Sequence, residues 1–246
     1  MSQAGLLNTS SSSTPVNPLQ TISDFDDFLS APGFDSSHGD PKLGWQNFSK
    51  TWHQFPGTAT NPGIVYNFGG TPDSDSFLLA NNNNDFAGTS SAFLLGGGSL
   101  SINWLIDLGT LSNGVNRYIT YIGLSDTNVQ DVIAQPQNGC FFKYSDNLNS
   151  GNWQIICGKA GVYTTVSTST AGAVGFTNFG ITVDASASSV IFKINGIIVG
   201  TTISTNIPNT VAIGPCLLMQ NVLGNLVSHY IDLFYYQQVL TTARPG

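Results

Sequence analysis

The sequence predicts an all-β fold, a two-sheet antiparallel sandwich, and three observations support this prediction. All 14 acidic residues in the 246-residue chain are Asp, so Glu, which favours helices, is absent. From residue 45 onward, short apolar runs alternate with turn segments rich in Gly, Pro, Asn and Ser, a spacing typical of sandwiches and barrels. One turn segment is an Asn-Gly pair between two apolar runs, which strongly indicates a β-hairpin.

The predicted strands are apolar runs enriched in β-branched and aromatic residues, which suit a pleated, half-buried surface. Pro lies mostly between these runs, as sheet pairing requires, because Pro cannot donate a backbone hydrogen bond. In chain order, we predict strands near 64–68, 77–80, 100–108, 118–124, 140–144, 153–157, 162–166, 180–183, 190–194, 197–203, 211–219 and 229–239.

Two hairpins can be registered from the sequence, and the first spans residues 190–199, VIFKINGIIV. Its Asn195-Gly196 pair supplies the two positive φ values of a type I′ turn. Such a turn places Ile194 opposite Ile197 and Phe192 opposite Val199.

The second hairpin turns around residues 146–152. Its register pairs, on one face, Tyr144 with Trp153, Phe142 with Ile155 and Cys140 with Cys157. Lys143 then meets Gln154 on the other face. The face of rings and thiols is either buried or a binding surface. Its two cysteines are either free thiols or a cross-strand disulfide, which needs tight geometry.

The first 39 residues are predicted to form a flexible arm with an acidic lead-in. Residues 1 to about 20 are rich in Ser and Thr and contain Pro15 and Pro18, so they bury too little surface to order alone. They either stay disordered or order against a partner. Residues 22–33 alternate Asp with Phe and Leu, as in a short helical turn or an extended segment. We therefore predict an arm at 1–39 and a jelly-roll β-sandwich at 40–246.

Charge and composition exclude several classes of partner and location. The net charge is −7 and the seven Lys and Arg residues form no cluster, so we predict no nucleic-acid partner. No apolar run approaches the roughly 20 residues of a membrane span, and the N-terminal residues do not resemble an export signal. An odd set of three cysteines in apolar runs favours synthesis in a reducing cytoplasm.

Five segments carry a resemblance to a known superfamily: RYITYIGLSD (117–126), GCFFKY (139–144), GNW (151–153), VIFKINGIIV (190–199) and IDLFYY (231–236). Together they resemble the concanavalin A-like lectin/glucanase jelly rolls, in the version found in bacteriophage virion proteins such as tail fibres and capsid decoration proteins. The resemblance covers about residues 40–243. It implies two curved antiparallel sheets, with a ligand site on the concave face or on the loops at its rim. The resemblance does not identify an activity, because proteins with the same fold have many different functions.

The residue types that catalysis would need are missing or isolated. The hydrolase branch of this superfamily resembles enzymes with two Glu residues on a concave strand, and glycoside hydrolysis needs a pair of carboxyl groups. The candidate carboxylates here stand singly, at Asp107, Asp126, Asp184 and Asp232. There is no Gly-x-Ser-x-Gly motif, and His229 is predicted to be an edge or surface residue. We predict that the protein is not an enzyme.

We also predict no metal site and no cofactor. Asp35, His38 and Asp40 are near enough in sequence to share a metal, but a loop explains the same residue types. The oxygen-rich segment 146–152 suits either Ca²⁺ or a hairpin turn, and we favour the turn. The Asp residues at 24, 26 and 27 are interpreted as a solvated acidic run.

Sugar binding is the function that the residue types support best as an alternative, because rings stack on pyranose faces while Asn and Asp bind hydroxyl groups. Our candidate binding residues are Trp153, Tyr144, Tyr121, Asp126, Asn149 and Asn152, and the rings of Trp45, Trp52 and Trp104 extend the set. Core packing is the competing role for Trp104 and Trp153.

Our leading functional hypothesis is a non-enzymatic phage virion structural protein, a capsid decoration or cement module attached through its arm. A tail-fibre module that binds a receptor or host surface glycan is the first alternative, and a sugar hydrolase is the second. The expected partners are other virion proteins and further copies of the chain in a homo-oligomer. The expected location is the virion, after synthesis in the host cytoplasm.

Overall fold

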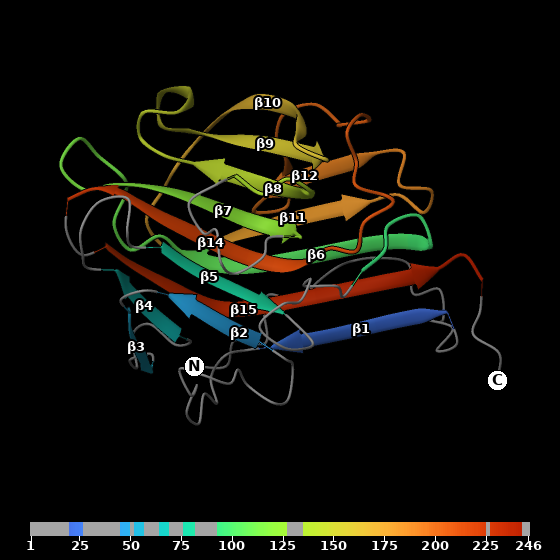
Figure 1. The fold of residues 1–246 in the computed structure, drawn as a ribbon, viewed down its shortest axis with the longest axis horizontal. Helices are drawn as coiled ribbons and strands as arrows, with labels where there is room; N and C mark the ends of the chain where they lie inside the picture. The colour runs from blue at the N-terminus through green and yellow to red at the C-terminus, as the bar shows by residue number, and fades with distance from the viewer. Residues whose placement is uncertain are drawn as a thin grey trace.

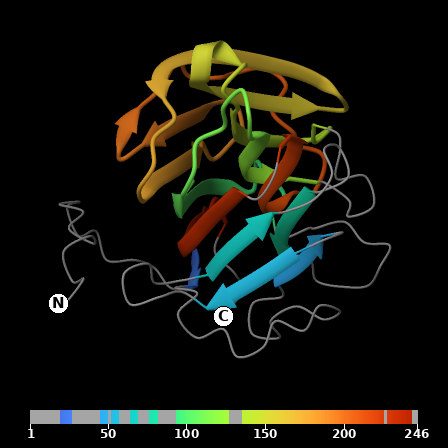
Figure 2. The same ribbon diagram turned by 90° about the vertical axis from the view of Figure 1, so that its left-hand side faces the viewer.

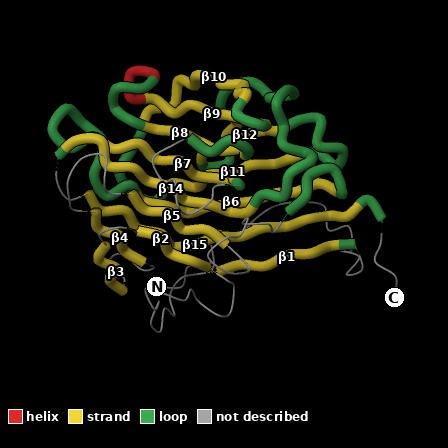
Figure 3. The backbone as a smooth tube through the Cα atoms, in the orientation of Figure 1, coloured by secondary structure: helices red, strands yellow, loops and turns green. Residues whose placement is uncertain are grey.

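The structure, a computed structural model, describes residues 20–26, 45–49, 52–56, 64–68, 76–81, 93–126, 135–224 and 227–242. These residues form two antiparallel sheets that stack face to face, so the predicted all-β sandwich is confirmed (Figures 1 and 2). In the described part of the chain the one helical element is the 3₁₀ turn Asn149–Gly151 (Figure 3). No helix among the described residues is long and apolar enough to cross a membrane.

The first sheet has seven strands, and β10 is its edge strand at the top of Figure 1. From that edge the order is β10 (Val162–Ala171), β9 (Asn152–Lys159), β8 (Gly139–Tyr144), β7 (Arg117–Ser125), β14 (Gly214–Leu223), β5 (Ser76–Asn81) and β2 (Trp45–Ser49). Every neighbouring pair is antiparallel.

The second sheet has eight strands and is organised around the longest strand, β15 (Val227–Leu240). β15 pairs with β6 along one side, and with β4 and then β1 along the other. The remaining bounds are β13 (Ile197–Ile198), β12 (Val190–Ile194), β11 (Thr177–Val183), β6 (Gly98–Asp107), β4 (Ile64–Phe68), β3 (Trp52–Pro56) and β1 (Thr21–Asp26).

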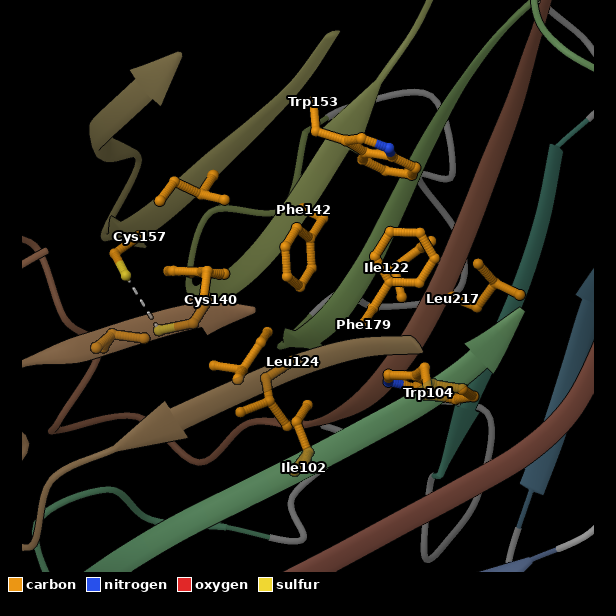
Figure 4. Packing of buried hydrophobic residues seen from close by; sticks show 14 of the residues in the cluster. Ile102, Trp104, Ile122, Leu124, Cys140, Phe142, Trp153, Cys157, Phe179 and Leu217 are labelled. Atoms are coloured by element: carbon orange, nitrogen blue, oxygen red, sulfur yellow. Dashed lines mark hydrogen bonds between the residues drawn. The ribbon is translucent and has the colours of Figure 1, made fainter. Parts of the chain in front are cut away.

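The main core lies between the two sheets and is rich in aromatic rings (Figure 4). The Phe142 ring packs edge to face against Trp153, Phe179 and Phe192, with ring centroids 5.1–6.1 Å apart. β6 shows why the sequence forms this layer: its residues alternate between buried and partly exposed along the whole strand, as a strand with one face on a core requires.

Both predicted hairpin registers are confirmed. Asn195 and Gly196 have φ values of 51° and 79°, Ile194 pairs with Ile197, and the Val199 amide donates to the Phe192 carbonyl over 3.0 Å. In the second hairpin, β8 and β9 pair Phe142 with Ile155, Cys140 with Cys157 and, on the other face, Lys143 with Gln154.

The described cysteines are free and buried. The Sγ atoms of Cys140 and Cys157 lie 3.4 Å apart as a thiol–thiol contact inside the main core (Figure 4). This hairpin face of rings and thiols is therefore a core surface, not a binding surface.

Three strands were not predicted, and one of them changes the predicted boundary of the arm. β1 lies within the segment assigned to the arm, yet its backbone pairs with residues 234–239 of β15. Residues 21–26 are therefore extended and belong to the sandwich, while residues 1–19 and 27–44, including Asp35, His38 and Asp40, lie outside the described part. β2 and β3, which begin at Trp45 and Trp52, were also missed.

The prediction for His229 is wrong. His229 is fully buried in β15, where its ring meets the Tyr118 ring edge to face with centroids 4.9 Å apart. β15 is an interior strand with neighbours on both sides, so a residue on its inner face is covered from every direction. Burial lowers the pKa of His229 to about 3.

Candidate functional site

The outer face of the seven-stranded sheet carries a second apolar cluster, separate from the main core. Its members alternate along β7, β8, β9 and β14 with residues that face the core, so they point away from the other sheet. The cluster consists of Tyr121, Phe141, Ile156, Cys216 and Leu218, with Ile119 and Tyr163 packed against it. This cluster forms an apolar floor on which polar side chains lie.

Lys143 places a positive charge on this face. Its ammonium lies 5.3 Å from the centre of the Tyr121 ring and donates a hydrogen bond of 2.8 Å to Gln135 Oε1. Lys143 is partly buried, and this burial lowers the pKa of its ammonium group. Because the Tyr121 hydroxyl is also largely buried, its pKa is raised and it remains protonated.

Tyr163 supplies a partly exposed ring on the same face. Its ring lies over Gly158, where an added β-carbon would come within 2.8 and 2.9 Å of two ring carbons. The missing side chain at Gly158 is therefore what lets this ring lie on the sheet. The Tyr163 hydroxyl is 3.5 Å from the Gln135 carbonyl oxygen, to which it donates. Burial and the nearby Asp126 carboxylate raise the pKa of Tyr163.

Asp126 and Asn138 hold the segment that carries Gln135. The Asp126 carboxylate accepts hydrogen bonds from the Asn138 backbone amide over 3.0 Å and from Asn138 Nδ2 over 2.6 Å. Asn138 Oδ1 in turn accepts from the Ala160 amide over 2.7 Å, and the Gly161 amide donates to the Gln137 carbonyl. These contacts fasten residues 135–138 to the β9–β10 turn.

We call the group Tyr121, Asp126, Gln135, Lys143 and Tyr163 the Lys143 site. It combines an ammonium group, an amide, a carboxylate and a phenol above an apolar floor. Such groups can bind the hydroxyl and acidic groups of a polar ligand, with a ring available at one side. Among the described residues the site contains one carboxylate, whereas glycoside hydrolysis needs a pair.

Of the six predicted binding residues, two lie in this site and four do not. Tyr121 and Asp126 belong to the Lys143 site, although Tyr121 is only 3% exposed and lies beneath the lysine. Trp153 and Tyr144 are 2% exposed and pack together in the main core, so a ring-stacking role for them is wrong. As the competing interpretation held, Trp153 and the fully buried Trp104 are core residues.

Asn149 and Asn152 lie at the other end of the sheet. They follow β8 near Arg117, whereas Asp126 follows the opposite end of β7. By the strand registers, Asn152 and Asp126 lie seven residues apart along the strands, or roughly 23 Å at about 3.3 Å per residue. Asn149 Nδ2 donates to the carbonyls of Trp153 and Thr168, and Asn152 Nδ2 donates to the Asn149 carbonyl. These amides hold the turn together, so the six residues do not form one site.

The favoured turn interpretation of segment 146–152 agrees with its contacts. Asn149, Ser150 and Gly151 have φ values of 47°, 56° and 76°, which Asn and Gly tolerate best. The Asp146 carboxylate forms a two-point ion pair with Arg117, with both contacts at 2.9 Å, and this pairing lowers the pKa of Asp146 to about 2. No group of three or more His, Cys, Asp or Glu side chains suited to a metal occurs in the described part of the chain.

The other described carboxylates also have structural contacts. Asp107 Oδ1 accepts from the amides of Gly109 and Gly175 and so joins two loops. Asp184 accepts from the Ser188 and Ser189 amides, and hydrogen bonding from this loop lowers its pKa. Asp232 is buried at the irregularity of β15 between Ile231 and Leu233.

Lys143 is the main site residue that the sequence-based candidates omitted. The predicted hairpin register places Lys143 opposite Gln154, on the face away from the rings and thiols. That placement is the one feature of the sequence that indicates an outward-facing lysine. A lone lysine among neutral residues on the outer face of a sheet was not recognised as a binding group.

Comparison with solved structures identifies the fold. The carbohydrate recognition domain of Emp47p superposes with a TM-score of 0.60 at 11% sequence identity, covering 92% of this chain and 100% of that domain. Peanut lectin superposes with a TM-score of 0.55 at 11% identity, covering 91% of this chain and 100% of the lectin. The fold is a two-sheet antiparallel jelly-roll sandwich of the concanavalin A-like type.

The lectin-like fold also occurs in a protein described as a carbohydrate esterase, vb_24B_21 of the Shiga toxin-encoding bacteriophage phi24B. It superposes with a TM-score of 0.50 at 15% identity, covering 90% of this chain and 98% of that protein. No protein-family model and no curated protein sequence matches the chain. The likeness therefore concerns the fold, which spans nearly the whole lengths of these proteins.

Proposed function

We propose that the protein is a non-enzymatic, lectin-like recognition module that binds a glycan through the Lys143 site. The observation that carries the proposal is the juxtaposition of the partly exposed Tyr163 ring with Lys143 and Gln135 on the outer face of a lectin-like sheet. A pyranose can rest against the ring while its hydroxyl groups bind the amide and ammonium groups.

The contacts of the described carboxylates support a binding role over a hydrolytic one. Asp107, Asp146 and Asp184 are held by loop amides or by Arg117, and each stands apart from the Lys143 site. Asp126 already accepts two hydrogen bonds from Asn138. No described carboxylate pair brackets a position where a glycosidic bond would lie.

The proposed setting is a bacteriophage virion, and glycan binding favours a receptor-binding position such as a tail fibre over a purely structural capsid decoration role. The virion setting rests on the resemblance of the five sequence segments to phage virion proteins. Mass spectrometry of purified virions tests it directly. If the virions lack this protein, the proposed setting is wrong.

A glycan array probed with the full chain tests the binding function. We expect saturable binding to at least one glycan class, and at least a tenfold loss on Tyr163→Ala. Tyr235→Ala is the matched control, because Tyr235 is a partly exposed tyrosine opposite Asn103 on the other sheet. Equal losses for both variants, or no binding to any glycan, would contradict the proposal. Sugar release by the wild-type chain would instead favour a hydrolase.

A further inference from the structure

We propose that the Lys143 site selects acidic sugars, with the Lys143 ammonium binding the carboxylate of a uronic or sialic acid residue. This inference rests on the proposed function and names its ligand class. It starts from the position of the lysine, from its partners and from the row of side chains beside it.

The Lys143 ammonium is partly removed from water, and no carboxylate of the described residues pairs with it. It has three donors, of which one is used by a neutral acceptor, Gln135 Oε1. Within the described residues it forms no ion pair, and its other contact is the Tyr121 ring. A charge withdrawn from water is unfavourable unless it is paired, so an anion at this position would be stabilised.

Two other described cations, Arg117 and Lys159, do not share this situation. Arg117 is neutralised by Asp146 through two contacts of 2.9 Å. Lys159 also donates to an amide oxygen, Asn209 Oδ1 over 2.8 Å, but this contact is exposed to solvent. By contrast, burial lowers the pKa of the Lys143 ammonium, and this shift reflects its partial removal from water. Lys143 thus differs from Arg117 and Lys159, because its surroundings favour an anionic partner.

The side chains beside Lys143 suit the rest of a sugar. Lys143 pairs across the sheet with Gln154, and Gln154 pairs with Ser167 on the edge strand β10. This outer-face row is neutral and polar beyond the lysine. Adjacent strands lie about 4.8 Å apart, so the row spans roughly 10 Å. A saccharide whose carboxylate meets Lys143 therefore has hydroxyl partners along the row. Tyr163 lies four residues further along β10, opposite Gly158.

The test compares carboxylated glycans with the same glycans as methyl esters, which removes the charge and keeps the ring. Oligogalacturonate and a sialylated lactose are the probes, each with its methyl ester and with neutral lactose. We expect the acids to bind the full chain at least tenfold more tightly than the esters. Replacing Lys143 with Met should reduce acid binding about ten- to hundredfold, the range of a charge-assisted hydrogen bond, and should lower ester binding by a much smaller factor, because the ester offers the ammonium no charge.

Lys159→Met is the matched control and should bind as the wild type does, because its amide contact is exposed and distant from the row. The thermal unfolding of each variant checks that a loss of binding is not a loss of folding. Equal binding of acids and esters, with glycan binding intact, would overturn this inference while the proposed function stands. Tighter binding of sulfated or phosphorylated glycans than of carboxylated ones would also overturn it. Failure to bind any glycan would refute both proposals.

Discussion

Acidification should destabilise the sandwich through His229. The effect should appear at a higher pH than the protonation of the carboxylates, so the two can be distinguished. The folded protein holds His229 neutral with a pKa of about 3, because the ring is fully buried, whereas the unfolded chain exposes it near the ordinary value of 6.5. The unfolded state therefore binds a proton that the folded state excludes. Stability is fully present above pH 6.5 and is lost as the pH falls towards 3.

The magnitude follows from the pKa difference. Each pH unit below 6.5 costs about 1.4 kcal/mol of unfolding free energy, so roughly 2–3 kcal/mol should be lost between pH 6.5 and pH 4.5. The Asp146 carboxylate, whose pKa is lowered to about 2, and its unfolded counterpart near 3.8 both remain mostly ionised in this range. The loss there therefore reports His229 and not acid titration of that ion pair.

Urea unfolding at pH 7.0, 6.0, 5.0 and 4.5 measures this effect on the wild type and on His229→Phe. Phenylalanine keeps the edge-to-face contact with Tyr118 and cannot be protonated. The other two histidines are present in both proteins, so the difference between the two pH profiles isolates His229. Parallel profiles, whatever their offset, would refute the reasoning, because they would mean that His229 binds its proton equally in both states.

Two packing predictions can be checked by denaturant and thermal unfolding. Phe142→Ala should lower the unfolding free energy by about 3–5 kcal/mol, because it removes a ring that contacts three other rings. Phe176→Ala is the control at a partly exposed position and should lower the unfolding free energy by less than half as much. Gly123→Ala should cost more than about 2 kcal/mol, since its β-carbon would lie 2.8 Å from Ile181 Cδ1 and from the Phe141 backbone. Gly114→Ala, with no atom within 4 Å of its β-carbon, should be near neutral. Equal effects within either pair would contradict the packing described here.

The strands and registers that the sequence predicted correctly depend on local chemistry. The turn at Asn195-Gly196 sets its own register, because two positive φ values and the period of two leave one pairing for the flanking residues. The missed strand β1 lacks such a signal. Its Asp-containing segment becomes a strand by pairing with β15, more than 200 residues away in the sequence, and no local pattern encodes that partner.

In the candidate site, too, some features follow from local sequence and others depend on tertiary contacts. The sequence identified Tyr121 and Asp126, and the hairpin register placed Lys143 and Gln154 on the face opposite Phe142 and Cys140. It did not identify which face of the sheet would meet the other sheet. For this reason Trp153 and Tyr144, which are good ring-stacking residues by type, were candidates until their burial was known.

By itself, then, the sequence determined the all-β class, two hairpin registers and the alternation of faces along each strand, because these follow from backbone geometry and turn chemistry over a few residues. Only the tertiary structure decided which face became the core and that Asn149 lies far from Asp126. It also decided that Lys143 rests on Tyr121 beside Gln135 and Tyr163. Those outcomes depend on how two sheets stack and on contacts between distant segments, so no short window of sequence contains them.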